Sequence, residues 1–243
     1  MPENAFLNSD TDKRLAIIVP YRDRLEHLKQ LIPHLINYFE RDKIDRNISV
    51  TIHIVEQLGD QEFNRGKLCN CGVSLSQSDA DYFCFHDVDY LPIWSDYSYC
   101  ETPTHLIWHG LPIMDHYNKF FGAVTMFNKA DFEKTNGFSN KYWGWGYEDE
   151  ELRERCGTVG LSIERREGTY QSLPHENVGY NSDGKHNPIA TRNLNLCKKR
   201  LKNLKELMSK DGLNSLDYRL DGTSKIKIDS KIYENVFLHK VEI

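Results

Sequence analysis

The sequence has no apolar run long enough to cross a membrane. Its longest runs, such as Leu15–Pro20, are far shorter than the roughly 20 residues that a transmembrane helix needs. The first residues, MPENAFLNSDTDKR, also lack the basic and apolar regions of a signal peptide. We therefore expect a soluble protein without a membrane anchor.

An excess of positive charge is missing as well. Lys and Arg number 31, whereas Asp and Glu number 36, which gives a net charge of −5 at pH 7. Such a chain has no overall cationic field to hold nucleic acid or an anionic membrane. We therefore expect no nucleic-acid partner, and nothing in the sequence indicates an obligate protein partner.

No internal repeat, low-complexity tract or clear linker divides the 243 residues. Length alone favours one large domain or two small ones. It also provides enough chain to bury a core without metal or disulfide staples. We predict one domain over residues 1–243.

Nothing indicates export, so we expect the six cysteines to be reduced thiols. Cys69 and Cys71 are separated by one residue and have no second Cys or His pair nearby, which disfavours a structural zinc site. The remaining cysteines are Cys84, Cys100, Cys156 and Cys197.

The first third of the sequence alternates between strand and helix patterns. The predicted elements are a buried strand at Leu15–Pro20, a helix from Leu25 to Phe39, a strand at Ile48–Val55, a helix at Asn64–Ser76 and a buried strand at Tyr82–Phe85. We expect Pro33 to kink or break the first helix. This order predicts a mostly parallel α/β sheet whose ligands gather at the carboxyl ends of its strands.

The second half is less regular. We predict a strand at Phe120–Phe127, a helix at Lys129–Thr135 closed by Asn136 and Gly137, a helix at Glu148–Cys156 with an acidic first turn, and a last strand at Val236–Val241. Residues Gly179–Pro188 are rich in turn formers and predict a mobile loop.

A basic amphipathic helix is predicted at Thr191–Ser209, with Leu194, Leu201, Leu204 and Met208 on one side. Such a helix can dock peripherally on an anionic membrane. It can equally pack its apolar side on the core and leave a solvated basic face.

Two carboxylates follow the third predicted strand, in His86-Asp87-Val88-Asp89. In an extended segment, residues two apart point the same way, so Asp87 and Asp89 can converge on one target. At this edge of a sheet they suit a hard divalent cation that bridges a diphosphate. The alternative is a turn in which the Asp side chains cap local backbone amides.

The most unusual segment is Asn140–Glu151, NKYWGWGYEDEE. Its glycines allow the backbone to approach a ligand closely, and tryptophan faces stack well on sugar rings. Mutual repulsion within the cluster Glu148–Glu151 raises carboxyl pKa values, which suits a general base. An aromatic core corner followed by a dipole-stabilised helix would explain Glu150 and Glu151, but not the preceding Trp-Gly-Trp-Gly.

Basic residues follow the first two predicted strands. Arg22 or Arg24, in Pro20-Tyr21-Arg22-Asp23-Arg24, could contact a phosphate or a nucleobase edge, as could Phe63-Asn64-Arg65. Both segments could instead be solvated helix starts with a capping residue. His175 could complete a metal site or be an ordinary surface histidine.

Five motifs occur in the order seen in the β-1,4-galactosyltransferases, glycosyltransferase family seven, and the sequence resembles this family from about Arg14 to about Leu220. They are PYRDR at 20–24, FNR at 63–65, HDVD at 86–89, WGWGYED at 143–149 and DGLNSL at 211–216. The HDVD form together with the WGWG block is most similar to the xylose-accepting branch. The absence of a visible anchor favours a bacterial cytoplasmic member, peripheral at the inner membrane at most.

The resemblance implies one GT-A domain with a Rossmann-like, mostly parallel sheet flanked by helices. It implies Mn²⁺, a UDP-galactose donor, a glycan acceptor and transfer to a sugar hydroxyl in β-1,4 linkage with inversion at the anomeric carbon. By position, the implied donor-binding residues are Pro20, Tyr21, Arg22, Arg24, Phe63, Arg65, Asp87, Val88, Asp89 and Trp145. The implied acceptor-binding residues are Gly146, Tyr147, Glu148 and Asp149, with Asp149 as the base that takes the proton from the acceptor hydroxyl.

The metal and donor pockets depart from the family pattern. The resemblance implies Asp89 and His175 as metal ligands, but Ser172 and Asn177 stand where the family supplies a further Met or His. The Asn177 amide is therefore the expected third ligand. Phe120 replaces a tyrosine that helps to choose the donor, which keeps a UDP-N-acetylgalactosamine transferase open. Rival functions are a catalytically inactive sugar- or nucleotide-binding protein and a metal-dependent phosphoryl hydrolase.

Overall fold

A computed structural model describes residues 13–46, 48–107, 120–175 and 179–243. In chain order its helices and strands are β1 (Lys13–Tyr21), α1 (Leu25–Arg46), β2 (Ile48–Gln57), α2 (Arg65–Ser76), β3 (Tyr82–His86), β4 (Tyr90–Ser95), β5 (Thr104–His105), β6 (Val124–Asn128), α3 (Lys129–Lys134), α4 (Glu148–Thr158), β7 (Glu164–Arg165), β8 (Gly168–Ser172), α5 (Pro188–Leu201), α6 (Leu204–Met208), a 3₁₀ turn (Leu213–Ser215), β9 (Arg219–Ile228) and β10 (Lys231–Glu242).

The described strands form an eight-stranded sheet in the order β7-β5-β6-β3-β1-β2-β10-β9, and β4 pairs with β8 in a second, two-stranded sheet. The central strands β3, β1, β2 and β10 are mutually parallel. The strands β6 and β9 join antiparallel to β3 and β10. The predicted mostly parallel α/β sheet is therefore confirmed, with antiparallel additions on both sides.

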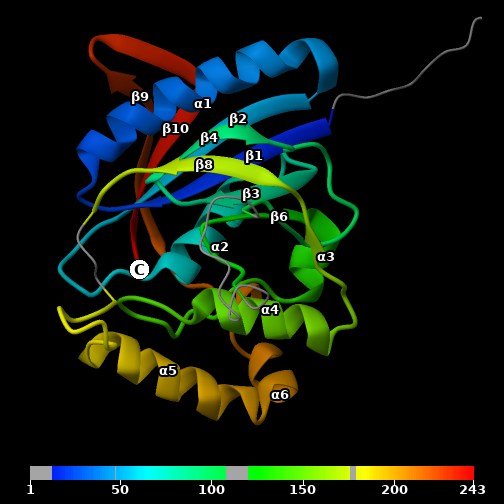
Figure 1. Cartoon of the computed structure of the whole chain (residues 1–243), viewed down its shortest axis with the longest axis vertical. Coiled ribbons are helices and arrows are strands. Elements are labelled where there is room, and N and C mark those ends of the chain that lie inside the picture. The colour runs from blue at the N-terminus through cyan, green and yellow to red at the C-terminus, as the bar shows by residue number, and fades with distance from the viewer. Residues whose placement is uncertain (1–12, 47, 108–119, 176–178) are drawn as a thin grey trace, which may run out of the picture.

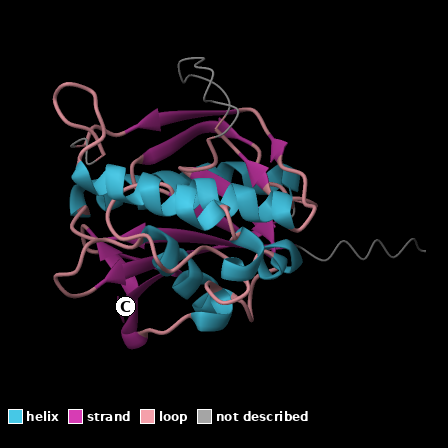
Figure 2. Ribbon diagram, turned by 90° about the horizontal axis from the view of Figure 1, so that it is seen from below, coloured by secondary structure: helices cyan, strands magenta, loops and turns pink. Residues whose placement is uncertain are grey.

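Helices cover both faces of the sheet, as Figures 1 and 2 show. One apolar core joins Leu15, Ile17 and Val19 of β1 to α1 and the β4–β8 side. A second core joins Ala16 and Ile18 to α2, α3 and α4. Because successive side chains of a strand point to opposite faces, one continuous apolar run in β1 supplies both cores. In Figure 1, α5 and α6 lie outermost, beyond α4.

The chain order places a crevice at the carboxyl ends of β1 and β3. From β1 the chain passes through α1 to β2 on one side, and then through α2 back across β1 to β3. The two connections therefore lie on opposite faces. Ligands of open α/β sheets bind where the strand order reverses in this way.

Several predicted elements need correction. The helix α1 continues through Pro33 without a break, because Leu28, Leu31, Ile32 and Leu35 remain buried against the sheet on either side of it. The strand predicted at Phe120–Phe127 begins only at Val124. Ala123, with φ 60°, interrupts the extended backbone before it.

The predicted helix at Thr191–Ser209 is two helices, α5 and α6. The buried side of α5 is half polar, with Ala190, Asn193, Cys197 and Arg200, whereas Leu201 is 38% exposed. The apolar stripe read from the sequence is therefore wrong for α5.

All six cysteines are free and buried. Burial raises the pKa of the Cys69 thiol to about 12, which suppresses its reactivity. Among the described helices, none combines the length and the apolar character of a membrane span.

Candidate active site

A cleft of about 1130 Å³ opens at the carboxyl ends of β1, β2 and β3. It brings together nearly all residues that the sequence singled out. Its lining includes Pro20, Arg22, Arg24, Phe63, Arg65, Asp87, Val88, Asp89, Trp145, Gly146, Tyr147, Glu148, Asp149 and His175. Asn177 lies outside the described residues.

One side of the cleft lies at and just beyond the ends of β1, β2 and β3, and we call it the strand-end wall. It consists of Pro20, Arg22, Asp23, Arg24, Glu62, Phe63, Arg65, Asp87, Val88, Asp89 and Tyr90. Arg22 donates a hydrogen bond to the Gln61 carbonyl oxygen at 2.6 Å, and its guanidinium carbon lies 5.5 Å from the Phe63 ring centroid. Tyr21 is the exception among the predicted residues. Its side chain is buried in the core under the wall and does not line the cleft.

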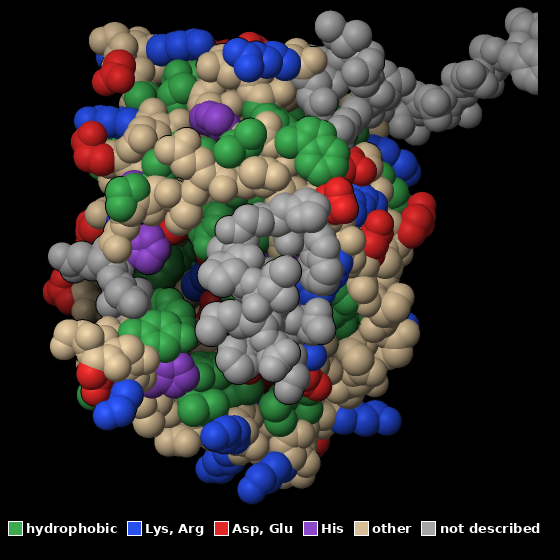
Figure 3. Space-filling view, in the orientation of Figure 1, with side chains coloured by type: hydrophobic (Ala, Val, Ile, Leu, Met, Phe, Trp, Pro, Cys, Tyr) green, Lys and Arg blue, Asp and Glu red, His purple; other side chains and the backbone are tan. Residues whose placement is uncertain are grey.

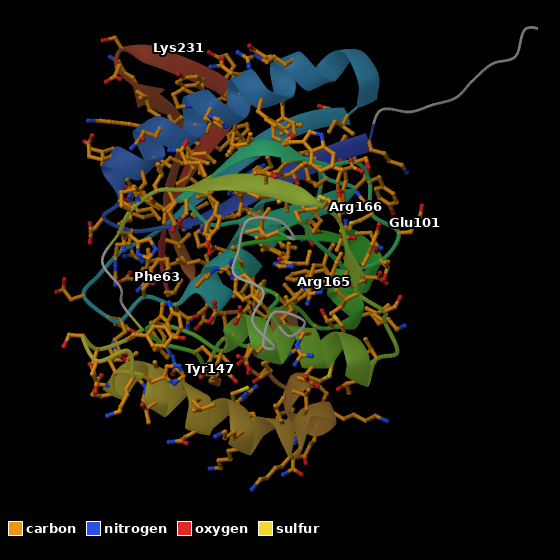
Figure 4. The ribbon with its side chains drawn as sticks, in the orientation of Figure 1. Phe63, Glu101, Tyr147, Arg165, Arg166 and Lys231 are labelled. Atoms are coloured by element: carbon orange, nitrogen blue, oxygen red, sulfur yellow. The ribbon has the colours of Figure 1, made fainter. Side chains whose placement is uncertain are left out.

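The opposite side, the helix wall, consists of residues 144–150, which lead into α4. Gly144, Gly146 and Tyr147 all have positive φ, at 77°, 95° and 77°. Glycine adopts such a backbone without strain, which explains why the segment alternates Trp with Gly. In Figure 4, Phe63 of the strand-end wall and Tyr147 of the helix wall lie on the same side of the molecule.

Arg65 connects the two walls. Its Nε donates to Asp87 Oδ1 at 2.6 Å, and its Nη1 lies 3.5 Å from Glu148 Oε1. Burial alone would lower the pKa of Arg65, but Asp87 and Glu148 hold it above its usual value. The Nη2 atom is buried without a hydrogen-bond partner among the described residues. This cation therefore sets the spacing between carboxylates of opposite walls.

Asp149 stands at the start of α4 and faces the cleft. Its Oδ1 accepts a hydrogen bond from the Glu150 amide at 2.9 Å. Burial raises the pKa of Asp149, and Arg65 opposes that rise. Burial and the neighbouring Asp149 raise the pKa of Glu148 to about 7. Two adjacent carboxyls that hold protons more tightly than usual fit a proton acceptor that works near neutral pH.

Two potential metal ligands lie side by side in the cleft. The Asp89 Oδ2 atom is 3.1 Å from His175 Nε2, and burial raises the pKa of Asp89, with Asp87 adding to the effect. Within the described ranges, no three His, Cys, Asp or Glu side chains group as a complete site. A carboxylate oxygen and an imidazole nitrogen are ligand types that suit Mn²⁺, so the pair is a candidate for part of a metal site.

Polar side chains hold the helix wall from behind. Asn193 of α5, which is 1% exposed, donates from Nδ2 to the carbonyl oxygens of Trp143 and Trp145, each at 3.0 Å. Arg192 bridges the Trp143 carbonyl oxygen and the Glu62 carboxylate, at 2.5 and 2.6 Å. The Trp-Gly-Trp-Gly segment is thus fixed through its backbone by α5.

Glu151 also has a role that its position did not suggest. It is fully buried, accepts from Arg155 and Arg200 at 2.9 and 2.6 Å, and accepts from the Tyr142 hydroxyl at 2.7 Å. Burial alone would raise the pKa of Glu151, but the Arg200 and Arg155 contacts lower it. Glu151 does stand in the acidic first turn of α4, as expected, and its buried ion pairs also join α4 to α5.

Sequence reasoning missed Tyr180 and His186, which also line the cleft. They pair across a β-bridge. Their ring centroids lie 5.4 and 6.3 Å from that of Trp145, and the His186 centroid lies 5.8 Å from that of Tyr147. The only signal was the presence of two aromatic rings within a turn-rich segment.

Two family models match the chain. The one described as the N-terminal region of glycosyl transferase group 7 matches residues 6–101, and the one described as the N-terminal domain of galactosyltransferase matches residues 103–176. Together they cover all the cleft segments up to His175.

Curated relatives include β-1,4-galactosyltransferase 4 of Cricetulus griseus, 35% identical over 219 residues, which cover 86% of this chain and 59% of the relative. Another is β-1,4-galactosyltransferase 7 of Mus musculus, 33% identical over 225 residues, which cover 88% of this chain and 64% of the relative. The chain thus spans less than two thirds of the length of these relatives.

A solved structure of the Drosophila β1,4-galactosyltransferase 7 catalytic domain with xylobiose superposes with a TM-score of 0.73 at 27% identity, covering 95% of this chain and 94% of that one. A mutant of that Drosophila enzyme, in complex with manganese, UDP-Gal and xylobiose, gives a TM-score of 0.71 at 28% identity with the same coverage.

Proposed function

The chain belongs to glycosyltransferase group 7, the family of the β-1,4-galactosyltransferases, and has the GT-A fold; on that premise, we propose that it transfers galactose from UDP-galactose to a sugar hydroxyl of a glycan acceptor in β-1,4 linkage. The observation that carries the proposal is the opposition of Asp89 and Asp149 on the two walls of one cleft. The related structure holds manganese, UDP-Gal and xylobiose together, which supports the use of a metal, a donor and a sugar acceptor.

The strand-end wall is the proposed donor side. Arg22 and Arg24 supply cations for the diphosphate or the base, Phe63 and Pro20 supply apolar surface, and Arg65 orients Asp87 toward the donor. Asp89 and His175 would hold Mn²⁺, with Asn177 as the further ligand. When bound, the ion stabilises the negative charge that develops on the departing diphosphate.

The helix wall is the proposed acceptor side. Trp145 and Tyr147 offer ring faces to a sugar, and Gly146 leaves open space in which the acceptor can approach the backbone. Asp149 takes the proton from the acceptor hydroxyl as its oxygen attacks the galactose anomeric carbon from the face opposite UDP. The bond from carbon to the diphosphate oxygen breaks in the same displacement, which inverts the configuration.

Residues 1–243 are proposed to form one catalytic domain, because β1 near the start and β10 near the end belong to the same sheet. The bacterial origin and the cytoplasmic location stay predictions. An inactive binding protein is disfavoured, since it would have no use for a proton acceptor such as Asp149 in the same cleft as the proposed metal ligands Asp89 and His175.

Transfer from UDP-N-acetylgalactosamine is the second candidate, because Phe120 lines the cleft near Gly122 without a hydroxyl to offer the donor. A donor screen separates the two. The protein is mixed with Mn²⁺ and each UDP-sugar, with and without xylosides and N-acetylglucosaminides, while UDP release is measured.

Release that requires UDP-galactose, metal and one acceptor supports the proposal. Preference for UDP-N-acetylgalactosamine favours the second candidate. Release that ignores every acceptor indicates hydrolysis, and would overturn both.

A further inference from the structure

The outer helices carry a local excess of positive charge in a protein whose net charge is −5. Between Pro188 and Lys210 the only acidic residue is Glu206. The same segment contains seven basic residues: Arg192, Lys198, Lys199, Arg200, Lys202, Lys205 and Lys210. Figure 3 shows blue Lys and Arg side chains gathered at the lower end of the molecule, where Figure 1 places α5 and α6.

Three of these seven cations are already neutralised. Arg200 is buried against Glu151 and Asp211, Arg192 pairs with Glu62, and Lys210 pairs with Glu206. The other four are exposed and make no ion pair within the described residues: Lys198, Lys199, Lys202 and Lys205. We call these four the α5–α6 lysines.

An exposed leucine stands among the α5–α6 lysines. Leu201 is 38% exposed, and it follows Lys198 by three residues, which places the two on one side of the helix. Lysine stems and an apolar side chain that face outward together match a membrane interface, where the ammonium groups reach the headgroups and the leucine enters the acyl boundary.

The β9–β10 hairpin also carries exposed lysines, but its positive and negative charges are nearly equal in number. Its 24 residues, 219–242, contain five Lys or Arg and four Asp or Glu. Arg219 pairs there with Glu242, and Lys240 lies near Glu56. The excess of positive charge in α5–α6 is therefore not shared by the hairpin.

We propose that the α5–α6 lysines and Leu201 form a docking surface for an anionic phospholipid bilayer. Nucleic acid is a poorer match, because readers of single strands present aromatic stacking surfaces and Arg forks, and this surface has lysines and a leucine. Electrostatic attraction of this kind acts within about one Debye length, about 8–10 Å at ordinary salt.

The position of the cleft adds a consequence that rests on the proposed function. Ile189, at the start of α5, lines the cleft, and the first of the α5–α6 lysines follows nine residues later, about 14 Å along the helix axis. A docked enzyme would hold its acceptor side within reach of a glycan carried on a membrane lipid.

The test is sedimentation with vesicles of phosphatidylcholine alone or mixed with phosphatidylglycerol, using the full chain. We expect binding only to the anionic vesicles, and its loss as salt is raised. Replacing all four α5–α6 lysines by glutamine should lower the partition coefficient by more than about 100-fold, since each lysine contributes roughly fivefold. Leu201→Ser should cause a smaller loss of vesicle binding, and the size of this loss should not depend on the salt concentration.

The matched control replaces Lys225, Lys227, Lys231 and Lys240 of the hairpin by glutamine, which changes the net charge by the same amount. This variant should bind vesicles almost as well as the parent. Equal loss in both variants, equal binding to neutral vesicles, or binding to duplex DNA but not to anionic vesicles would overturn the proposal. Vesicle binding is measured without any sugar donor, so its failure is distinct from a failure of the proposed activity.

Discussion

The two walls of the cleft are held by different interactions. The strand-end wall rests on β1, β2 and β3, which are joined by a parallel backbone ladder and backed on both faces by fully buried residues such as Ile17 and Ile18. The helix wall packs on the second apolar core through α4, and it depends in addition on polar contacts, chiefly those from Asn193 and around Glu151. A ladder loses little when one side chain changes, whereas a polar contact fails when one partner is removed.

We expect the two walls to have different functions, which single substitutions can distinguish. Changes in the helix wall should lower turnover and acceptor binding and leave the binding of UDP nearly intact. Changes in the strand-end wall should do the reverse.

Asp149→Asn should show the largest difference between an effect on turnover and an effect on UDP binding. We expect kcat to fall by about 10³-fold, because asparagine cannot accept the acceptor proton, a contribution typically of 10²–10⁴-fold. UDP affinity, measured by calorimetry with Mn²⁺ present, should change by less than about threefold. Glu154→Gln, further along the same helix and not among the residues that line the cleft, is the control and should keep most of its activity.

Asp89→Asn on the opposite wall completes the pair. It should weaken metal-dependent UDP binding in the same calorimetric assay. Near-normal turnover in Asp149→Asn, or unchanged UDP binding in Asp89→Asn, would contradict the assignment of catalysis to the helix wall and donor binding to the strand-end wall.

Gly122→Ala tests the close approach between Gly122, just before β6, and the carboxylate of Asp149, the proposed base. A Cβ atom there would lie 2.5 Å from Asp149 Oδ2 and 2.9 Å from the Phe120 ring. Because the carboxylate must move, we expect about a 10²-fold loss of kcat/KM, as for a misplacement of about 1 Å. Gly157→Ala in α4, where nothing lies within 4 Å, should leave kcat/KM unchanged.

We expect the pH dependence of the activity to arise from two carboxyl groups of the helix wall. The raised pKa of Glu148, about 7 against the usual 4.5, and the raised pKa of Asp149 mean that the fold favours the protonated carboxyls. Activity should therefore rise with pH over this range, as Asp149 becomes able to accept a proton.

The stability of the fold should have the opposite pH dependence. The unfolded chain releases these protons near pH 4.5, so the free energy of unfolding should decrease as pH rises from there toward 7. Rate profiles and thermal unfolding across pH measure both trends. Glu148→Gln should flatten the stability trend, and an unchanged slope would show that other groups cause it.

Asn193→Ala should have the mildest effect on catalysis. It removes the hydrogen bonds to the Trp143 and Trp145 carbonyl oxygens, which should cost about 1–3 kcal/mol of unfolding free energy. We expect a severalfold rise in the acceptor KM with unchanged UDP affinity. Asn195→Ala, on the exposed side of α5, should match the parent in both assays, and equal effects would refute the support by Asn193.

The strand-end wall could be predicted from the sequence because its determinants are local. The buried runs at Leu15–Pro20 and Tyr82–Phe85 lie within β1 and β3 and miss their ends by one or two residues. Strand and helix alternation then places the residues after each strand at one edge. Nearly all of these residues line the cleft, and their chemical roles stay predictions.

The support of the helix wall could not be predicted, because it depends on contacts between residues far apart in the sequence. Arg200 and Glu151 are 49 positions apart, and charged residues on a basic helix are usually solvated. The edge strand β9 was missed for a related reason. Eight of its ten residues are exposed, and apolar and polar residues alternate only over Lys225–Ile228, which is a short pattern for a strand.

Tyr147 has a consequence for how this protein can be engineered. A tyrosine with φ of 77° costs roughly 1–2 kcal/mol relative to a relaxed backbone, and glycine would relieve that cost. A library screened for heat resistance alone would therefore favour glycine at position 147 and discard a ring that lines the cleft. Stabilised versions of this protein are best selected with an acceptor present, so that the screen also detects what the strained residue contributes.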